Sequence, residues 1–111
     1  GGRKSRALTT RFIDKVHNAA ELSELEIVSP LDVETRGSQG SLSHPDGYEI
    51  VQAMIASGVI CDYREPEVLR FGIAPLYNSF EDIIRAVDLM KDIVKNKRYR
   101  DPAFGDRNDV T

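Results

Sequence analysis

Apolar residues recur at helical spacing in three stretches of the chain. In the first stretch the apolar stripe consists of Leu8, Phe12, Ile13, Val16, Ala19 and Ala20. The opposite face is polar and consists of Arg6, Thr9, Lys15 and His17. A stripe with this spacing, preceded by Ser5 as the capping residue, predicts an amphipathic helix of about four turns.

The second stretch predicts a helix that starts at Pro45 and Asp46 and stops at Gly58. Proline favours the first turn of a helix, and glycine favours the position just beyond its end. The predicted apolar side of this helix consists of Tyr48, Val51, Met54 and Ile55.

The third stretch predicts a long helix near the end of the chain. Asn78 or Ser79 is expected to cap it, and Ser79 with Asp82 resembles a capping box. We expect the helix to end near Lys97. Its predicted core stripe consists of Phe80, Ile83, Ile84, Val87, Met90, Ile93 and Val94.

Predicted strands occupy four short runs between the helices: 25–28, 41–43, 59–61 and 68–71. Residues 64–67 are expected to form a turn, because Pro66 fixes φ and lacks an N–H donor. Gly72 is expected to allow a bend or a close backbone approach. The resulting order, helix, strand, strand, helix, strand, strand, helix, predicts an α+β fold. We expect a two-layer sandwich with a small, mostly antiparallel sheet covered by helices on one face.

The length and charge of the chain limit the classes of function. A chain of 111 residues is long enough for one domain with a modest core. We therefore expect a single domain over residues 1–111, with 98–111 as a polar tail. A formal net charge of −3 gives no electrostatic case for binding nucleic acid or an anionic membrane. The basic residues that close the last helix complement its dipole: Lys95, Lys97, Arg98 and Arg100.

Cysteine usage and hydropathy predict a cytoplasmic protein. Cys61 is the single cysteine in the sequence, which excludes an intrachain disulfide and fits a reducing compartment. It lies in a predicted buried strand, so we interpret it as a small core residue. The sequence contains no apolar run long enough to span a membrane and no visible signal peptide.

Patterns that would support metal or phosphate chemistry are weak. His17 and His44 have no partners at metal-ligand spacing, and both are interpreted as surface residues. The glycine-containing segment 37–41 lacks the lysine of a phosphate-binding loop, so we interpret it as a turn or strand entry. No nucleophile and base can be paired from their spacing.

Arg70 is a cation inside an otherwise apolar strand. One interpretation is that it faces water on the polar side of an antiparallel sheet, where apolar and polar residues alternate. The other is that it lies at the edge of a cleft, where its planar fork suits a carboxylate. Residue chemistry alone favours the solvent-facing interpretation.

Several motifs resemble the C-terminal region of kynureninases. They are V-I-x-D-x-R, the R-x-P turn, L-R-F-G and A-P-L-Y-N-S-F, all within residues 58–80. Upstream, R-K-S-R-A-L-T-T-R-F-I-D, R-G-S-Q and H-P-D-G-Y also fit that region. The resemblance covers nearly the whole chain.

The resemblance implies a pyridoxal-phosphate enzyme of the aspartate aminotransferase superfamily that acts as a homodimer. Such enzymes hydrolyse L-kynurenine or 3-hydroxykynurenine to an anthranilate and L-alanine in tryptophan catabolism, with the cofactor as electron sink. In that family the arginine of the L-R-F-G strand binds the substrate α-carboxylate, and it corresponds to Arg70. The resemblance therefore favours the carboxylate-binding interpretation.

The resemblance also implies that the catalytic machinery lies outside this sequence. In the family, the Schiff-base lysine and the residues that bind the cofactor belong to a large domain that precedes this one. We expect the large domain to be the partner of this chain, and the chain alone to bind no cofactor and to be inactive. Arg6 and Arg11 depart from the apolar character expected of a helix that docks onto a large domain. The alternative is a free-standing α+β module that binds a small anionic ligand or a protein partner.

Overall fold

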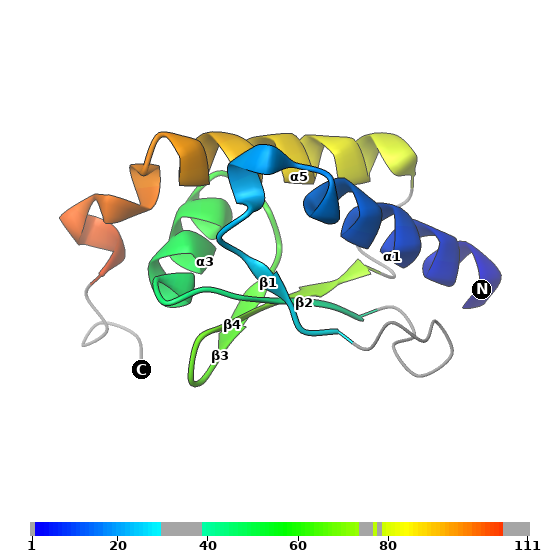
Figure 1. The fold of residues 1–111 in the computed structure, drawn as a ribbon, viewed down its shortest axis with the longest axis horizontal. Helices are drawn as coiled ribbons and strands as arrows, with labels where there is room; N and C mark the ends of the chain where they lie inside the picture. The colour runs from blue at the N-terminus through cyan, green and yellow to red at the C-terminus, as the bar shows by residue number, and fades with distance from the viewer. Residues whose placement is uncertain (1, 30–38, 74–76, 78, 106–111) are drawn as a thin grey trace.

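The structure, a computed structural model, describes residues 2–29, 39–73, 77 and 79–105 (Figure 1). The helices and strands, in chain order, are α1 (Gly2–His17), β1 (Glu26–Ile27), β2 (Gln39–Ser43), α3 (Gly47–Ala56), β3 (Asp62–Arg64), β4 (Val68–Gly72) and α5 (Phe80–Lys95). Short 3-10 helices follow α1 and α5: η1 (Ala20–Leu22), η2 (Arg98–Arg100) and η3 (Pro102–Phe104). This order of helices and strands confirms the predicted one.

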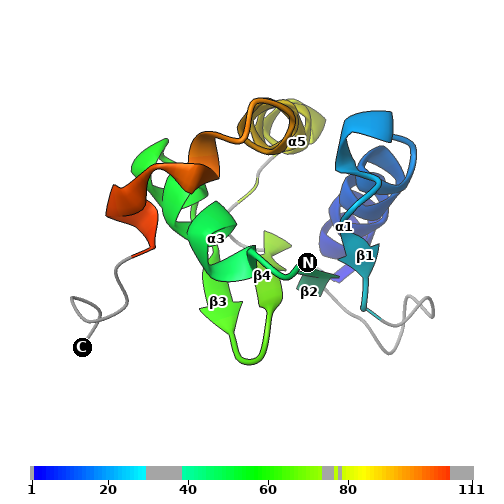
Figure 2. The same ribbon diagram turned by 60° about the vertical axis from the view of Figure 1, so that its left-hand side comes forward.

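The described strands form one antiparallel sheet in the order β1-β2-β4-β3. Along β4, Leu69 and Phe71 are buried while Val68, Arg70 and Gly72 are partly exposed. Helices α1, α3 and α5 lie on one face of the sheet, as Figures 1 and 2 show. Phe71 packs against Phe12 of α1, so this is the face that carries the buried residues. The predicted two-layer α+β fold, with helices on one face of an antiparallel sheet, is therefore confirmed.

The first helix begins before its predicted start. Ser5 lies inside α1 and does not cap it, and Ala20 is exposed in η1. Thr9, predicted on the polar face, is fully buried and donates its hydroxyl hydrogen to the Ser5 carbonyl at 2.9 Å. Because the helix backbone itself accepts this hydrogen bond, a buried threonine carries no unpaired donor.

Most residues predicted for the apolar stripes of α3 and α5 are buried, and three of them are exposed. Ile55 is 45% exposed, and Ile50, which the prediction omitted, is buried. In α5, Phe80 and Ile84 are 46% and 38% exposed. Ser79 caps α5 as predicted, because its hydroxyl oxygen accepts a hydrogen bond from the Asp82 N–H at 3.3 Å. The helix ends at Lys95, slightly before the predicted end.

The prediction of a strand at residues 59–61 is wrong, because the hydrogen-bonded ladder of β3 begins only at Asp62. Gly58 adopts a φ of 94°, which ends α3, and the Val59 N–H donates to the Met54 carbonyl at 3.0 Å. The turn at 65–67 joins β3 to β4 as predicted, with a cis bond before Pro66.

Close backbone packing occurs at Gly40 and not at Gly72. A Cβ atom on Gly72 would meet no described atom within 4 Å, whereas one on Gly40 would lie 2.9 Å from the ring of Phe12. Phe12 also packs against Phe71, with ring centroids 4.9 Å apart, so α1 and the centre of the sheet meet at this glycine.

The beginning of the predicted tail belongs to the core. Tyr99, in η2, is only 2% exposed and packs with the buried cluster. The rest of the tail from residue 106 onward and the irregular segment predicted at 31–36 lie outside the described residues, as do Gly37 and Ser38. Gln39 and Gly40 open β2, so this part of the glycine-containing segment is a strand entry.

Candidate functional site

The face of the sheet opposite the helices carries a polar row that crosses three strands. Arg70 on β4 is paired in register with Asp62 on β3 and with Ser41 on β2. Residues paired across adjacent strands point to the same face, so this row lies on the side away from Leu69 and Phe71. Among the described residues, no helix covers this face (Figure 2).

Arg70 and Asp62 form a two-point ion pair. Nε of Arg70 donates to one Asp62 carboxylate oxygen at 2.7 Å, and Nη2 donates to the other at 3.0 Å. The side chain of Arg70 is 33% exposed and that of Asp62 is 60% exposed. The hydrogen bonds that Arg70 donates to Asp62, together with the negative charge of Asp62, raise the pKa of the Arg70 guanidinium above its ordinary value. Arg70 is therefore a permanent cation whose fork already holds a carboxylate.

Within the described part of the chain, Arg70 retains donors for a second anion. A guanidinium carries five N–H donors, and Asp62 accepts from two of its nitrogen atoms. The Nη1 nitrogen is not used in this pair, so the outer edge formed by Nη1 and Nη2 can approach another carboxylate. The sequence analysis named Arg70 but not Asp62, because the pairing of these two residues depends on the register of the β3–β4 hairpin.

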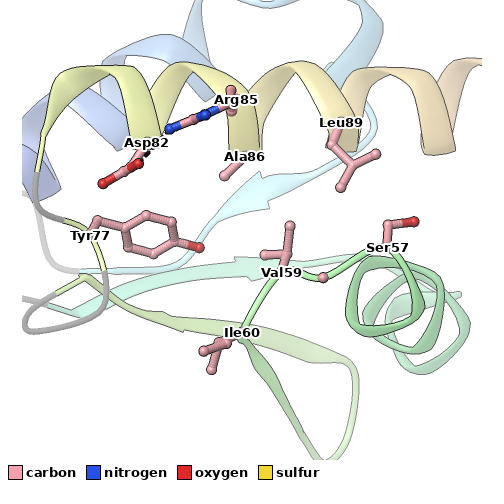
Figure 3. Close-up of a pocket in the computed structure, with 9 residues that line it drawn as sticks. Ser57, Val59, Ile60, Tyr77, Asp82, Arg85, Ala86 and Leu89 are labelled. Atoms are coloured by element: carbon pink, nitrogen blue, oxygen red, sulfur yellow. Dashed lines mark hydrogen bonds and ion pairs between the residues drawn. The ribbon is translucent and has the colours of Figure 1, made fainter.

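A separate pocket of about 580 Å³ lies between the end of α3 and the start of α5 (Figure 3). Its polar lining includes Tyr77 and the Asp82–Arg85 ion pair, whose atoms are 2.8 Å apart. The Tyr77 hydroxyl has no hydrogen-bond partner within the described part of the chain. Burial, with smaller contributions from Cys61 and Asp82, raises the pKa of Tyr77 to about 12. The described lining of the pocket therefore presents a neutral phenol and a compensated ion pair, and none of these lining residues offers an uncompensated positive charge to an anionic substrate.

Comparison with known proteins decides the family. The family model of the kynureninase C-terminal domain matches residues 2–90. The chain belongs to this family. It is 48% identical over 109 residues to the kynureninases of Burkholderia mallei and Burkholderia pseudomallei, covering 98% of this chain and 26% of each relative. A kynureninase of Pseudomonas fluorescens is 43% identical over the same length. The chain thus spans about a quarter of the length of these relatives, and Arg70, Asp62 and the pocket all lie within the matched region.

The two histidines of the domain differ in exposure, and neither belongs to a cluster of metal-ligating side chains among the described residues. His17 is exposed as predicted, but His44, predicted at the surface, is only 4% exposed. Its Nδ1 accepts a hydrogen bond from the Asp46 N–H at 2.8 Å, and its ring packs edge-on against Tyr99. Across the described ranges, no group of three or more metal-ligating side chains is present. In the same ranges, no helix is long and apolar enough to cross a membrane.

Cys61 and the lysines of the domain are poorly placed for covalent chemistry. Cys61 is partly buried against the core, and burial, helped by Asp62, raises the pKa of its thiol to about 12. Each lysine lies on α1, on α5 or just after α5: Lys4, Lys15, Lys91, Lys95 and Lys97. None of them lies on the sheet that carries Arg70.

Proposed function

We propose that this chain is the C-terminal domain of a kynureninase and that Arg70 binds the α-carboxylate of the substrate. The parent enzyme would hydrolyse L-kynurenine or 3-hydroxykynurenine to an anthranilate and L-alanine. The observation that supports this role is the two-point pair of Arg70 with a carboxylate on the helix-free face of the sheet. In this pair the side chain, held by β4, presents its fork to a carboxylate.

The chemistry of the proposed reaction explains why an arginine is needed. Two parallel hydrogen bonds fix both the position and the rotation of a carboxylate, whereas a lysine fixes only a point charge. The rotation matters because it decides which substrate bond is aligned with the reacting group. Pyridoxal phosphate, when bound, would supply the electron sink for cleavage of the carbon–carbon bond.

We assign the cofactor site to a large domain of the longer protein. The helix positions of the lysines in this chain do not fit a Schiff-base role beside Arg70, and the chain spans only 26% of its relatives. In this proposal the helix-free face of the sheet is turned toward the large domain, and the parent acts as a homodimer. The chain alone would then neither hold the cofactor covalently nor cleave kynurenine.

Substitution of Arg70 in the full-length enzyme tests the assignment. We expect Arg70→Gln to lower kcat/KM for L-kynurenine by about 100-fold or more, because the substrate loses both its charge partner and its orientation. Arg70→Lys should restore little, since an ammonium cannot form the fork.

Arg98→Gln is the matched control for this test. Arg98 forms a 2.8 Å ion pair with Asp92. Asp92 lies near the end of α5, and Arg98 lies in η2. Its replacement should leave kcat/KM unchanged. A normal kcat/KM in the Arg70→Gln enzyme would contradict the proposed role.

A further inference from the structure

We propose that Asp62 is a positioning residue that holds Arg70 ready for the substrate. Asp62 binds the inner edge of the guanidinium, formed by Nε and Nη2, and thereby directs the outer edge, formed by Nη1 and Nη2, toward the incoming carboxylate. This inference rests on the proposed function of Arg70.

The backbone places the two residues together. Asp62 and Arg70 are direct partners in the β3–β4 ladder, on strands joined by the short turn at 65–67. The distance between their side chains is therefore set by the hairpin and needs no long-range contact. Two hydrogen bonds of 2.7 Å and 3.0 Å then fix the plane of the guanidinium as well as its position.

Folding stability alone gives little reason for this pair. Asp62 is 60% exposed and Arg70 is 33% exposed, and exposed ion pairs contribute little to the stability of a fold. Orientation is a stronger reason, because an arginine side chain has many rotamers. If Asp62 did not restrict them, substrate binding would have to do so, at a cost in affinity.

An opposite interpretation makes the opposite prediction. If Asp62 occupied the place of the substrate carboxylate, it would have to be displaced, and its removal would lower KM. If Asp62 positions Arg70 through the inner edge, its removal raises KM. The direction of the change in KM therefore distinguishes a positioning role of Asp62 from occupation of the substrate site by Asp62.

The experiment uses the full-length enzyme with Asp62→Ala, and with Asp62→Asn as a variant that preserves side-chain size. We expect both to raise KM for L-kynurenine, the alanine variant by about 10-fold, with a smaller change in kcat. The control is Asp88→Ala, because Asp88 is 64% exposed and pairs with Lys91 on α5. It should leave KM unchanged.

An analogue of kynurenine with hydrogen in place of the α-carboxylate tests whether the effect runs through carboxylate binding. Its inhibition constant should be the same for the wild-type enzyme and for Asp62→Ala. A general loss of structure would weaken both ligands. Equal weakening of the substrate and the analogue would overturn the inference.

A double substitution separates failure of this inference from failure of the proposed function. In the Arg70→Gln background, Asp62→Ala should have no further effect, since a positioning residue acts through the group it positions. An unimpaired Arg70→Gln enzyme would overturn the role of Arg70 and this inference with it. An impaired Arg70→Gln enzyme beside an unchanged or lowered KM in both Asp62 variants would overturn the inference alone.

Discussion

Cys61 holds its thiol in the neutral form well above neutral pH. Burial and the nearby Asp62 charge raise its pKa from 9.0 to about 12. Between these two values the unfolded chain releases the proton and the folded chain keeps it. The free energy of unfolding should therefore be fully maintained below pH 9 and should fall as the pH rises toward 12.

Guanidinium-induced unfolding of the isolated chain at pH 8 and pH 10.5 measures this effect. The Cys61→Ala variant should lose less stability between these two pH values than the wild type. Tyr77, whose pKa rises from 10.0 to about 12, contributes in the same direction to both proteins. Equal losses in the two proteins would contradict the prediction.

Single residues also show where sequence patterns lose their predictive value. The polar character of Thr9 and His44 predicted exposure, but both are buried, and backbone groups of their own segments pair with Thr9 Oγ1 and His44 Nδ1. Such local pairing is not visible in hydropathy. The pairing of Asp62 with Arg70 was equally hidden, since a cross-strand partner depends on the register of the hairpin.

At the level of elements, the cap of α5 is open to direct measurement. Ser79 accepts a hydrogen bond from the Asp82 N–H, one of the helix donors that have no partner inside the helix. Ser79→Ala should lower the free energy of unfolding by about 1 kcal/mol, as measured by chemical denaturation.

Ser79→Asp serves as the control for the cap, because a carboxylate also accepts this hydrogen bond and favours the positive end of the helix dipole. It should retain the stability of the wild type. The role of Ser79 as a cap would be refuted if the alanine variant were as stable as the aspartate variant.

The order of helices and strands could be predicted because hydrophobic periodicity is local to each element. The start of β3 could not be predicted, because an apolar, β-prone run does not show where strand pairing begins. Residues 59–61 follow Gly58, whose φ is 94°, and the β3 ladder begins only at Asp62. Hydrophobic periodicity also does not show whether each residue of a predicted apolar stripe is buried by a neighbouring element. Phe80 remains 46% exposed, and the Arg11 guanidinium lies 4.7 Å from its ring centroid. Arg11 was unexpected on a helix predicted to be more apolar, and this cation–π contact with Phe80 accounts for its position on the surface of the domain.

At the scale of the whole molecule, the hydrophobic pattern predicted the fold, and the family motifs predicted the function. The alternation along β4 predicted that Arg70 would face away from Leu69 and Phe71, and it does. A functional role for Arg70 came only from the family motifs, since alternation is the same for a surface cation and a ligand-binding one. The fold was thus within reach of local physical rules, whereas the proposed site extends beyond the chain.

A site that extends beyond the chain should bind its ligand weakly when the chain is alone. Arg70 offers the carboxylate one edge of its fork, in contact with water and beside the negative charge of Asp62. Contacts to the amine and the ring of kynurenine would come from the large domain. We therefore expect L-kynurenine added to the isotope-labelled chain to cause no saturable NMR shift below about 1 mM, which corresponds to only about 4 kcal/mol of binding. The Arg70→Gln chain is the matched control for shifts unrelated to the fork. Saturable shifts around Arg70 at lower concentration, absent from that variant, would favour a free-standing anion-binding module over half of an enzyme site.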